Sequence, residues 1–117
     1  MTDANLELGR LHPDTFGART ITLSPDAART ALVGGVGDAL GMDAQTAAVG
    51  VAEMVDENMT NAARVHAVEN GKDLAEYSMV AFGGGAPLHA SRLIDKLGID
   101  EVLVPAGAGV GLSLIHI

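Results

Sequence analysis

The sequence predicts an α/β fold with long helices and a C-terminal βαβ unit around a glycine loop. Three observations carry this prediction. A capped helical pattern runs from Asp43 to about Asn70, three glycines (Gly83–Gly85) stand between a short apolar strand and a helix, and a second apolar strand ends at Pro105. Strand, glycine turn, helix and strand in this order are typical of a parallel βαβ unit. The length of 117 residues suits one small domain.

The N-terminal part predicts a loop followed by a weak helix. Residues 1–22 show no sustained hydrophobic period, so we expect a loop with short extended pieces. A helix is expected to begin at Ser24-Pro25-Asp26, because serine caps helices and proline suits the first turn. It would run to about Leu40 and end at Gly41. Each glycine inside it costs up to about 1 kcal/mol relative to alanine, so we expect it to be weak or broken at Gly34, Gly35 and Gly37.

The second helix carries the strongest periodic signal in the chain. Asp43 is the expected cap, and Gly71 the expected left-handed stop after Asn70. Apolar residues recur every three or four positions, which predicts one buried stripe. Polar residues, Asp56 among them, lie mostly off it. The members of the predicted stripe are Ala48, Val51, Val55, Met59, Ala62 and His66.

The C-terminal half supplies the predicted βαβ unit. Residues 77–82 are expected to form a short buried strand, and residues 101–104 a second one. Between them, Pro87 suits the first turn of a helix that continues to Leu97 and stops at Gly98. The three glycines before Pro87 require a tight turn between strand and helix.

Composition excludes several classes of function. The chain is 48% hydrophobic but only 3% aromatic, so its core is expected to be thin and built from small aliphatic side chains. A formal net charge of −8 argues against nucleic-acid and anionic-membrane partners. The absence of cysteine excludes disulfides, thiolate zinc sites and cysteine nucleophiles. No apolar run could span a bilayer and the first ten residues are polar, so a cytoplasmic location is expected.

The glycine turn is the best candidate for chemistry. Consecutive glycines before a helix let the backbone approach a ligand closely, and a helix start presents free N–H groups. A tight turn without any ligand explains the same residues equally well. Two familiar nucleotide motifs fail: a Rossmann pattern from Gly83 meets Leu88 where glycine is needed, and a P-loop through Gly71-Lys72 meets His66 and Asp73.

Histidines and short acidic motifs give weaker candidates. The four histidines share no metal-ligand spacing, and we predict no metal site on them. His66 is read as a packed core residue, whereas His89 could face a bound nucleotide, with a helix-surface or interface position as the favoured alternative. Asp3 and Asn5 could ligate magnesium, with short Asx turns as the favoured alternative. No residue is predicted as the catalytic base.

Two separated segments resemble one known family. The stretch AFGGGAPLHA (residues 81–90), within residues 62–111, is similar to the hydantoinase A/5-oxoprolinase family, particularly its N-methylhydantoinase-like members. MTDANLELGRL at the start resembles a second segment of the same family, in the same order. One departure is small: the family often has GGAGP or GGAAP where this chain has GGAP at residues 84–87. Small residues are kept, so the tight turn survives.

The resemblance implies a fold and a reaction. It implies a partial ribonuclease-H-like lobe of the actin/Hsp70/sugar-kinase superfamily, in which a strand and glycines hold the adenosine end of ATP. That role would fall on Gly83, Gly84 and Gly85, with Ala86 beside them. The implied reaction is the ATP- and Mg²⁺-dependent opening of a cyclic amide, such as a hydantoin or 5-oxoproline, through a phosphorylated carbonyl.

Alternatives remain at the level of the reaction. The same resemblance is also consistent with an ATP-dependent carboxylase of the acetone or acetophenone type. A different class of function, a non-catalytic structural module, is the other alternative. A cyclic amide is the implied small-molecule partner, and a second, B-type hydantoinase subunit is a possible protein partner. Because the family's phosphate-binding segments are missing, we expect residues 1–111 to be a fragment of the hydantoinase domain and to be inactive alone.

The last six residues, Leu112–Ile117, have a separate explanation. They match the translation of the mosaic-end adapter used in transposase-based sequencing libraries, and such scars are excluded from fold reasoning. The alternative is a genuine apolar C-terminal strand. We therefore expect native sequence to stop near Gly111 and build no site on His116.

Overall fold

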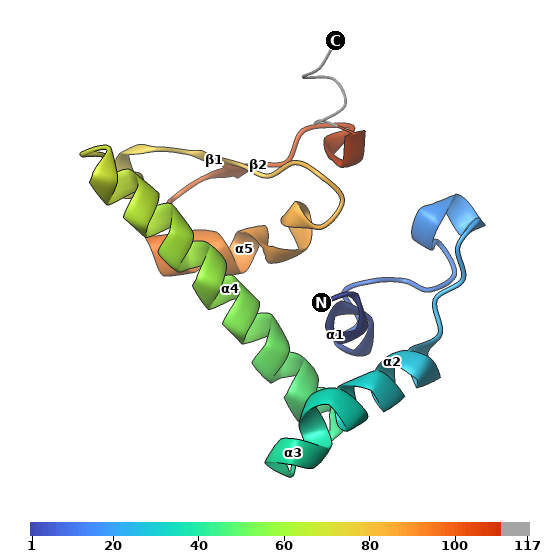
Figure 1. The fold of residues 1–117 in the computed structure, drawn as a ribbon. Coiled ribbons are helices and arrows are strands. Elements are labelled where there is room, and N and C mark those ends of the chain that lie inside the picture. Colours follow the sequence, from blue (N-terminus) through green and yellow to red (C-terminus); the bar gives the residue numbers. More distant parts are fainter. Residues whose placement is uncertain (111–117) are drawn as a thin grey trace. The chain divides into compact units, whose positions relative to one another are not determined.

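A computed structural model describes residues 1–110, which form an α/β, mostly helical arrangement of two compact units (Figure 1). The first unit comprises residues 1–55, and the second begins at Asp56, inside a long helix that starts in one unit and ends in the other. None of the helices within residues 1–110 is long and apolar enough to cross a membrane. The main elements in chain order are α1 (Thr2–Glu7), α2 (Pro25–Leu32), α3 (Asp38–Leu40), α4 (Ala44–Glu69), β1 (Met79–Val80), α5 (Ala86–Leu97) and β2 (Val102–Leu103).

The N-terminal residues form a helix, so the loop predicted for residues 1–22 is wrong in this part. Among the described residues helix α1 has no side-chain cap, and six residues are too few to show a hydrophobic period, so no helix was predicted here. Burial stabilises it instead. Ala4 is 1% exposed and lies in a core cluster with Leu32, Ala47 and Ala48, all within the first unit. A 3₁₀ turn follows at Phe16–Arg19.

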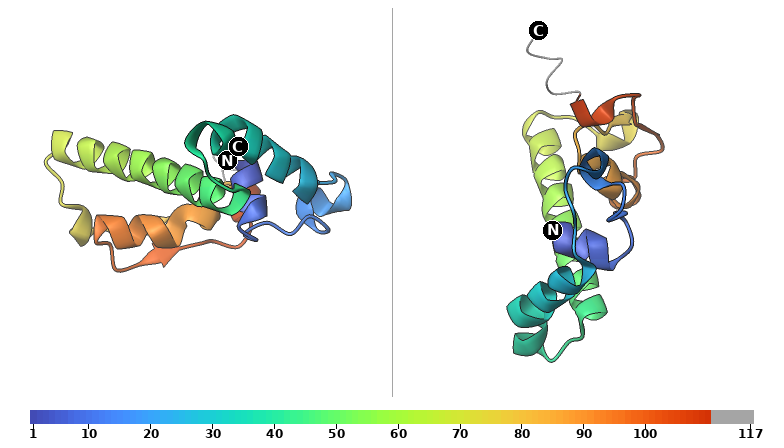
Figure 2. Two further views of the ribbon diagram at one scale, coloured as in Figure 1. Left: turned by 90° about the horizontal axis from the view of Figure 1, so that it is seen from below. Right: turned by 90° about the vertical axis from the view of Figure 1, so that its right-hand side faces the viewer.

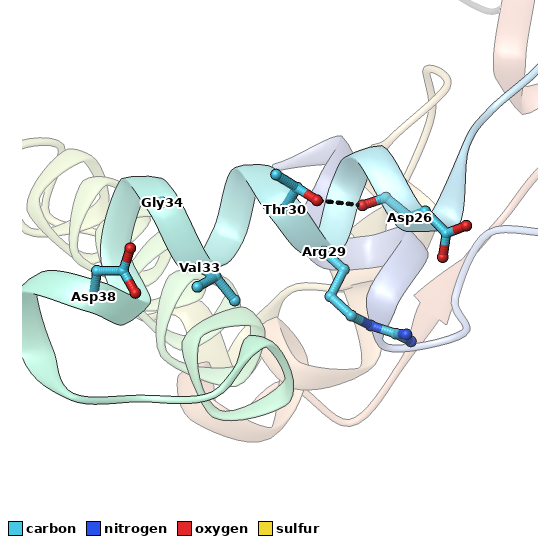
Figure 3. A pocket seen from close by; sticks show the side chains of 6 residues that line it. All are labelled: Asp26, Arg29, Thr30, Val33, Gly34 and Asp38. Atoms are coloured by element: carbon cyan, nitrogen blue, oxygen red, sulfur yellow. Dashed lines mark hydrogen bonds between the residues drawn. The ribbon is translucent and has the colours of Figure 1, made fainter.

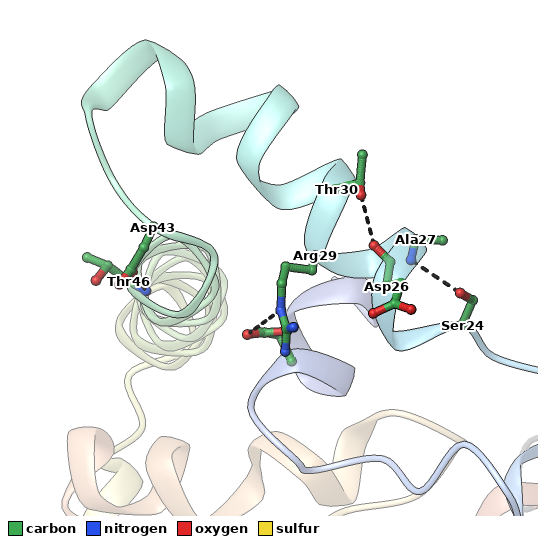
Figure 4. Close-up of polar contacts among 8 residues, drawn as sticks. Ser24, Asp26, Ala27, Arg29, Thr30, Asp43 and Thr46 are labelled. Atoms are coloured by element: carbon green, nitrogen blue, oxygen red, sulfur yellow. Dashed lines mark hydrogen bonds and ion pairs between the residues drawn. The ribbon is translucent and has the colours of Figure 1, made fainter.

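Helix α2 begins where the sequence predicted. Ser24 Oγ accepts a hydrogen bond from Ala27 N at 3.2 Å, and Pro25 occupies the first turn (Figure 4). The predicted break is also present. Residues Val33–Gly37 form a π-helical turn between α2 and α3, and Gly41 stops α3 with φ +66°. Helix α1 packs on α2, and Arg29 Nε donates to Glu7 Oε2 at 3.2 Å across them.

The predicted caps of α4 are confirmed. Asp43 Oδ1 accepts a hydrogen bond from Thr46 N at 2.8 Å, and Figure 4 shows the two side chains together at the start of the helix. The helix ends at Glu69, one residue before the predicted end, and Gly71 follows with φ +62°. Helix α4 can be followed without interruption in both views of Figure 2.

The buried face of α4 differs from the predicted stripe. Met59, Ala62 and His66 are exposed, so the prediction of His66 as a core residue is wrong. The buried positions recur every four residues along most of the helix, about one residue away from the predicted stripe. Small side chains on this buried face let neighbouring backbone approach closely. The polar residues on the same face were not predicted to be buried. The buried members include Ala48, Ala52, Asp56, Thr60 and Ala67.

The second unit contains the predicted parallel strand pair. Met79 pairs with Val102 and Val80 with Leu103, with helix α5 between the strands in sequence. The strands are shorter than predicted, two residues each. Val80 and Leu103 are 52% and 57% exposed, so the buried strand expected at residues 77–82 is not buried at Val80. The predicted stop of α5 is confirmed by Gly98, with φ +69°.

The π-helical turn generates a prediction about Gly37. A Cβ at Gly37 would lie 2.6 Å from the carbonyl oxygen of Met42, whereas one at Gly35 would meet nothing within 4 Å. We expect Gly37→Ala to lower the unfolding free energy by about 1–3 kcal/mol, because backbone must move. Gly35→Ala is the matched control and should be neutral or stabilising by up to about 1 kcal/mol. Urea unfolding of both variants measures this, and equal stabilities would contradict the turn geometry.

The cap at Asp43 generates a prediction about pH. Hydrogen bonds from the Thr46 side chain and then its backbone N–H lower the pKa of Asp43 below its ordinary value of 3.8. A lowered folded-state pKa means that the cap stabilises the protein above pH 3.8, and that this contribution is lost as pH falls through the lowered pKa. Asp43→Asn keeps the acceptor oxygen but cannot titrate.

The measurement is the unfolding free energy at neutral pH and below pH 3.8 for wild type and Asp43→Asn. We expect wild type to lose more stability on acidification than the variant. Identical losses would show that the cap does not depend on the ionised carboxylate.

Candidate functional site

The glycine loop lies directly after strand β1, in the second unit. Ala81 N donates a hydrogen bond to Leu103 O at 2.9 Å, which extends the strand pairing to the edge of the loop. Gly83 then adopts φ +97°, a conformation that L side chains rarely adopt, and its N–H donates to Ala108 O. Helix α5 begins three residues later, at Ala86. The predicted tight turn between strand and helix is therefore present.

The loop is open where a ligand would approach. Among residues 1–110, a Cβ built on Gly83, Gly84 or Gly85 would meet no atom within 4 Å. No side chain of this part of the chain caps the start of α5 at Gly85. Outside the helices and strands, the backbone hydrogen bonds among the same residues include none donated by Gly84, Gly85 or Ala86. Glycine is therefore not needed at positions 84 and 85 to avoid a clash with the described residues, whereas position 83 needs it for its positive φ.

A second turn, at the end of β2, lies next to the glycine loop and was missed by sequence reasoning. Ala108 N donates to Pro105 O at 3.0 Å, and Gly107 has φ +76°. The hydrogen bond from Gly83 to Ala108 joins the two turns. Both follow the carboxyl ends of parallel strands, the edge at which open α/β sheets bind their ligands. Pro105 and Gly107, which favour turns, were the residues from which this turn could have been predicted.

His89 lies one helical turn into α5 and is buried against α4, so the helix-surface part of its alternative is wrong and the position fits the interface part. Its Nδ1 lies 2.7 Å from Asp56 Oδ1 on α4, and the two side chains are 7% and 1% exposed. Asp56 was expected on the polar side of α4, and no local signal distinguishes it from the other acids of that helix. Thr60, one turn further along α4, is fully buried, and its Oγ1 has no hydrogen-bond partner among the described residues.

The other sequence candidates belong to elements other than the loop. Asp3 and Asn5 belong to helix α1, so the Asx-turn interpretation is wrong; Asp3 is exposed, and Asn5 is buried with its Oδ1 unpartnered. His12 is exposed, and His116 lies outside the described residues. Within residues 1–110 no group of three His, Asp, Glu or Cys side chains could hold a metal ion.

Two surface hollows are lined by residues outside the loop. One, of about 410 Å³, follows α2 into the π-helical turn, where Figure 3 shows Arg29 and Asp26 on α2 and Asp38 at the start of α3. The other, of about 420 Å³, is lined by the end of α4 and the following segment, including His66, Lys72 and Tyr77. Each lies within one unit, and neither carries a cluster of metal ligands or nucleophiles.

Comparison with known proteins identifies the family. The sequence model of the hydantoinase/oxoprolinase family matches residues 1–114. The chain belongs to this family. The resemblance inferred from AFGGGAPLHA and MTDANLELGRL is thereby confirmed. Among relatives, the hydantoinase/oxoprolinase chain is 33% identical over 105 residues to caprolactamase subunit alpha of Pseudomonas jessenii, and 30% identical over 116 residues to 5-oxoprolinase of Saccharomyces cerevisiae.

Solved structures agree with the sequence relatives. A nucleotide-free acetone carboxylase matches 92% of this hydantoinase/oxoprolinase chain with a TM-score of 0.85 at 30% identity. The ATP-dependent caprolactamase of Pseudomonas jessenii matches 93% of it with a TM-score of 0.82 at 32% identity. The matches cover only 15% and 16% of those two chains, 15% of the caprolactamase sequence and 9% of the 5-oxoprolinase. This chain therefore spans a small part of the proteins it resembles.

Proposed function

We propose that the complete protein carrying this chain is an ATP-dependent hydrolase that opens a cyclic amide such as a hydantoin, a lactam or 5-oxoproline. In this proposal Gly83, Gly84, Gly85 and Ala86 hold the adenosine end of ATP, with His89 beside them. The observation that carries it is the open, uncapped glycine loop after a parallel strand, in a chain similar to an ATP-dependent caprolactamase.

The loop's chemistry fits a nucleotide. The N–H groups of Gly84, Gly85 and Ala86, which donate no backbone hydrogen bond outside the helices and strands within residues 1–110, would donate to the hydroxyl and ring-nitrogen acceptors of an adenosine. The absence of Cβ atoms on the three glycines would let a flat ring approach the backbone closely. The net charge of −8 would repel an anionic ligand at long range. Attraction of the nucleotide must therefore come from the backbone N–H dipoles of the loop itself. Close backbone donors, rather than a basic field, are expected to supply the affinity.

The chemistry requires activation of the amide. An amide carbonyl is a poor electrophile, and ATP supplies a phosphoryl group that turns the carbonyl oxygen into a leaving group. This chain's residues bind and orient the nucleotide for that step, which is catalysis by positioning. Mg²⁺ is proposed for the complete protein, but the described residues hold no cluster of ligands for it, so we assign no step to it here.

The proposal extends to fold and assembly. We place the chain in a ribonuclease-H-like lobe of the actin/Hsp70/sugar-kinase type, because a strand, a glycine loop and a helix hold the nucleotide in that arrangement. A second, B-type subunit is the proposed protein partner, since one relative carries the name of a subunit alpha. Residues 1–111 are proposed as part of the hydantoinase/oxoprolinase domain, and Leu112–Ile117 as adapter-derived.

A carboxylase subunit is the second candidate. It is favoured by the TM-score of 0.85 with an acetone carboxylase. Both candidates would use the same loop for ATP, so the loop cannot separate them. The acceptor of the phosphoryl group separates them: an amide carbonyl in the hydrolase, a ketone and bicarbonate in the carboxylase. A non-catalytic module would bind no nucleotide at all.

The first test is turnover by the complete protein. We expect phosphate release from ATP to depend on an added cyclic amide, with ring-opened product formed in step. The 117-residue chain alone should show none, because small misplacement of reacting groups already costs about a hundredfold. ATP consumption that requires bicarbonate and a ketone instead would establish the carboxylase.

The second test is Gly84→Val in the complete protein. The backbone of Gly84 is not left-handed and its Cβ direction is open, so the fold should tolerate valine. A branched side chain would fill the proposed nucleotide space, and we expect ATP affinity to fall at least about tenfold, the loss of roughly one good hydrogen bond to a charged or polar group. Calorimetric titration with ATP measures this.

Gly50→Val is the matched control for that variant. Gly50 lies on α4, outside the loop sequence, and among the described residues its Cβ direction is equally open. It should leave ATP affinity unchanged. Equal affinity for ATP in Gly84→Val and wild type would show that the turn is structural only.

A further inference from the structure

The buried pair of Asp56 and His89 is unusual in the chain. Asp56 Oδ1 and His89 Nδ1 are 2.7 Å apart, and their side chains are 1% and 7% exposed. Taking a carboxylate out of water is unfavourable unless a partner compensates it, and an apolar pair of the same volume is often at least as stable. Stability alone therefore does not account for a buried acid on a face otherwise made largely of alanine.

Other contacts already join the same two helices. Lys96 Nζ on α5 forms an ion pair with Glu57 on α4, and Arg64 Nη2 on α4 donates to the carbonyl oxygen of Lys96. Both contacts involve the C-terminal end of α5, and Glu57 is half exposed. Holding α5 against α4 does not require a second, buried pair at the other end. The Asp56–His89 pair differs from them in lying next to the glycine loop.

His89 follows the glycine loop by one turn of α5. It is the fourth residue of the helix, whose cap is Gly85. Helical side chains tilt toward the helix N-terminus and lie over the preceding turn. A side chain at this position is therefore expected to lean toward the first turn of α5, which follows the glycine loop. A carboxylate bound at Nδ1 fixes the plane of that ring and the position of its other nitrogen.

We propose that Asp56 is a positioning residue for the ligand site: by accepting the Nδ1 proton of His89 it sets the ring's tautomer and directs Nε2 toward the ligand at the glycine loop. The inference rests on the proposed function, since the ligand is taken to be an adenine nucleotide. Asp56 acts only through His89 and touches no ligand. The same arrangement orients histidines in other sites, where an acid behind the ring selects the nitrogen that stays free.

The experiment measures the tautomer of His89 and the affinity for ATP in the complete protein. Nitrogen-15 NMR of the histidine ring, assigned with His89→Gln, reports which nitrogen carries the proton. Calorimetry gives ATP affinity for wild type, Asp56→Asn, His89→Gln and the double variant. Thr60→Val is the matched control, because it alters the same buried face one turn away and removes an unpartnered hydroxyl at no expected loss of stability.

We expect Nδ1 of wild-type His89 to carry a proton. Asp56→Asn can donate to Nδ1 instead, and should weaken ATP binding about fivefold to tenfold, as for one lost hydrogen bond. The double variant should be no weaker than His89→Gln alone, because Asp56 acts through the ring. Thr60→Val should bind ATP as wild type does.

Three results would overturn the inference. A wild-type ring protonated at Nε2 alone contradicts it without any variant having to fold. Unchanged ATP affinity in a folded Asp56→Asn, or additive losses in the double variant, would reduce the pair to a structural contact. A wild type that binds no ATP overturns the proposed function, and the tautomer measurement distinguishes that failure from a misassigned pair.

Discussion

The second unit is organised by one interaction, the hydrogen bond between Asp56 and His89. It places a carboxylate on the buried face of α4, where only a partner can compensate the lost hydration. Because His89 stands one turn after Gly85, the bond fixes the rotation of α5 at the end that follows the glycine loop. The strand pair fixes the other side of the loop through Ala81 and Leu103. Open glycines between two fixed supports give a preorganised backbone surface, which would lose little entropy on binding the proposed ligand.

Local signals in the sequence predicted the element ends well. The caps at Ser24 and Asp43 and the left-handed glycines act within a few residues, so they can be read without a tertiary structure. The burial of Asp56 and the exposure of His66 could not be predicted this way. Both depend on which face of α4 meets another helix, and a shift of one residue turns that face by about 100°. Helix α1 was missed for the same reason, since burial of Ala4 rather than a cap stabilises it.

The candidate site was predicted in part. The glycine loop and His89 were proposed from residue type and order, because consecutive glycines before a helix allow close backbone approach, although a tight turn alone also needs them. The turn at Pro105–Ala108 and the acid behind His89 were not, since each is brought to the loop by pairing between distant segments. Family membership is shown by the sequence model, whereas the reaction stays a proposal. The proposal is guided by relatives that are named as caprolactamase, 5-oxoprolinase and acetone carboxylase.

Hydrogen exchange of the complete protein with and without ATP tests the central claim most directly. If the loop holds the nucleotide, the amides of Gly84, Gly85 and Ala86 should exchange more slowly when ATP is bound, because ligand atoms would accept hydrogen bonds from these N–H groups. Amides of the hollow along α2 and the π-helical turn should not change, and serve as the internal reference. ATP binding that protects other segments while residues 84–86 exchange as before would contradict the account.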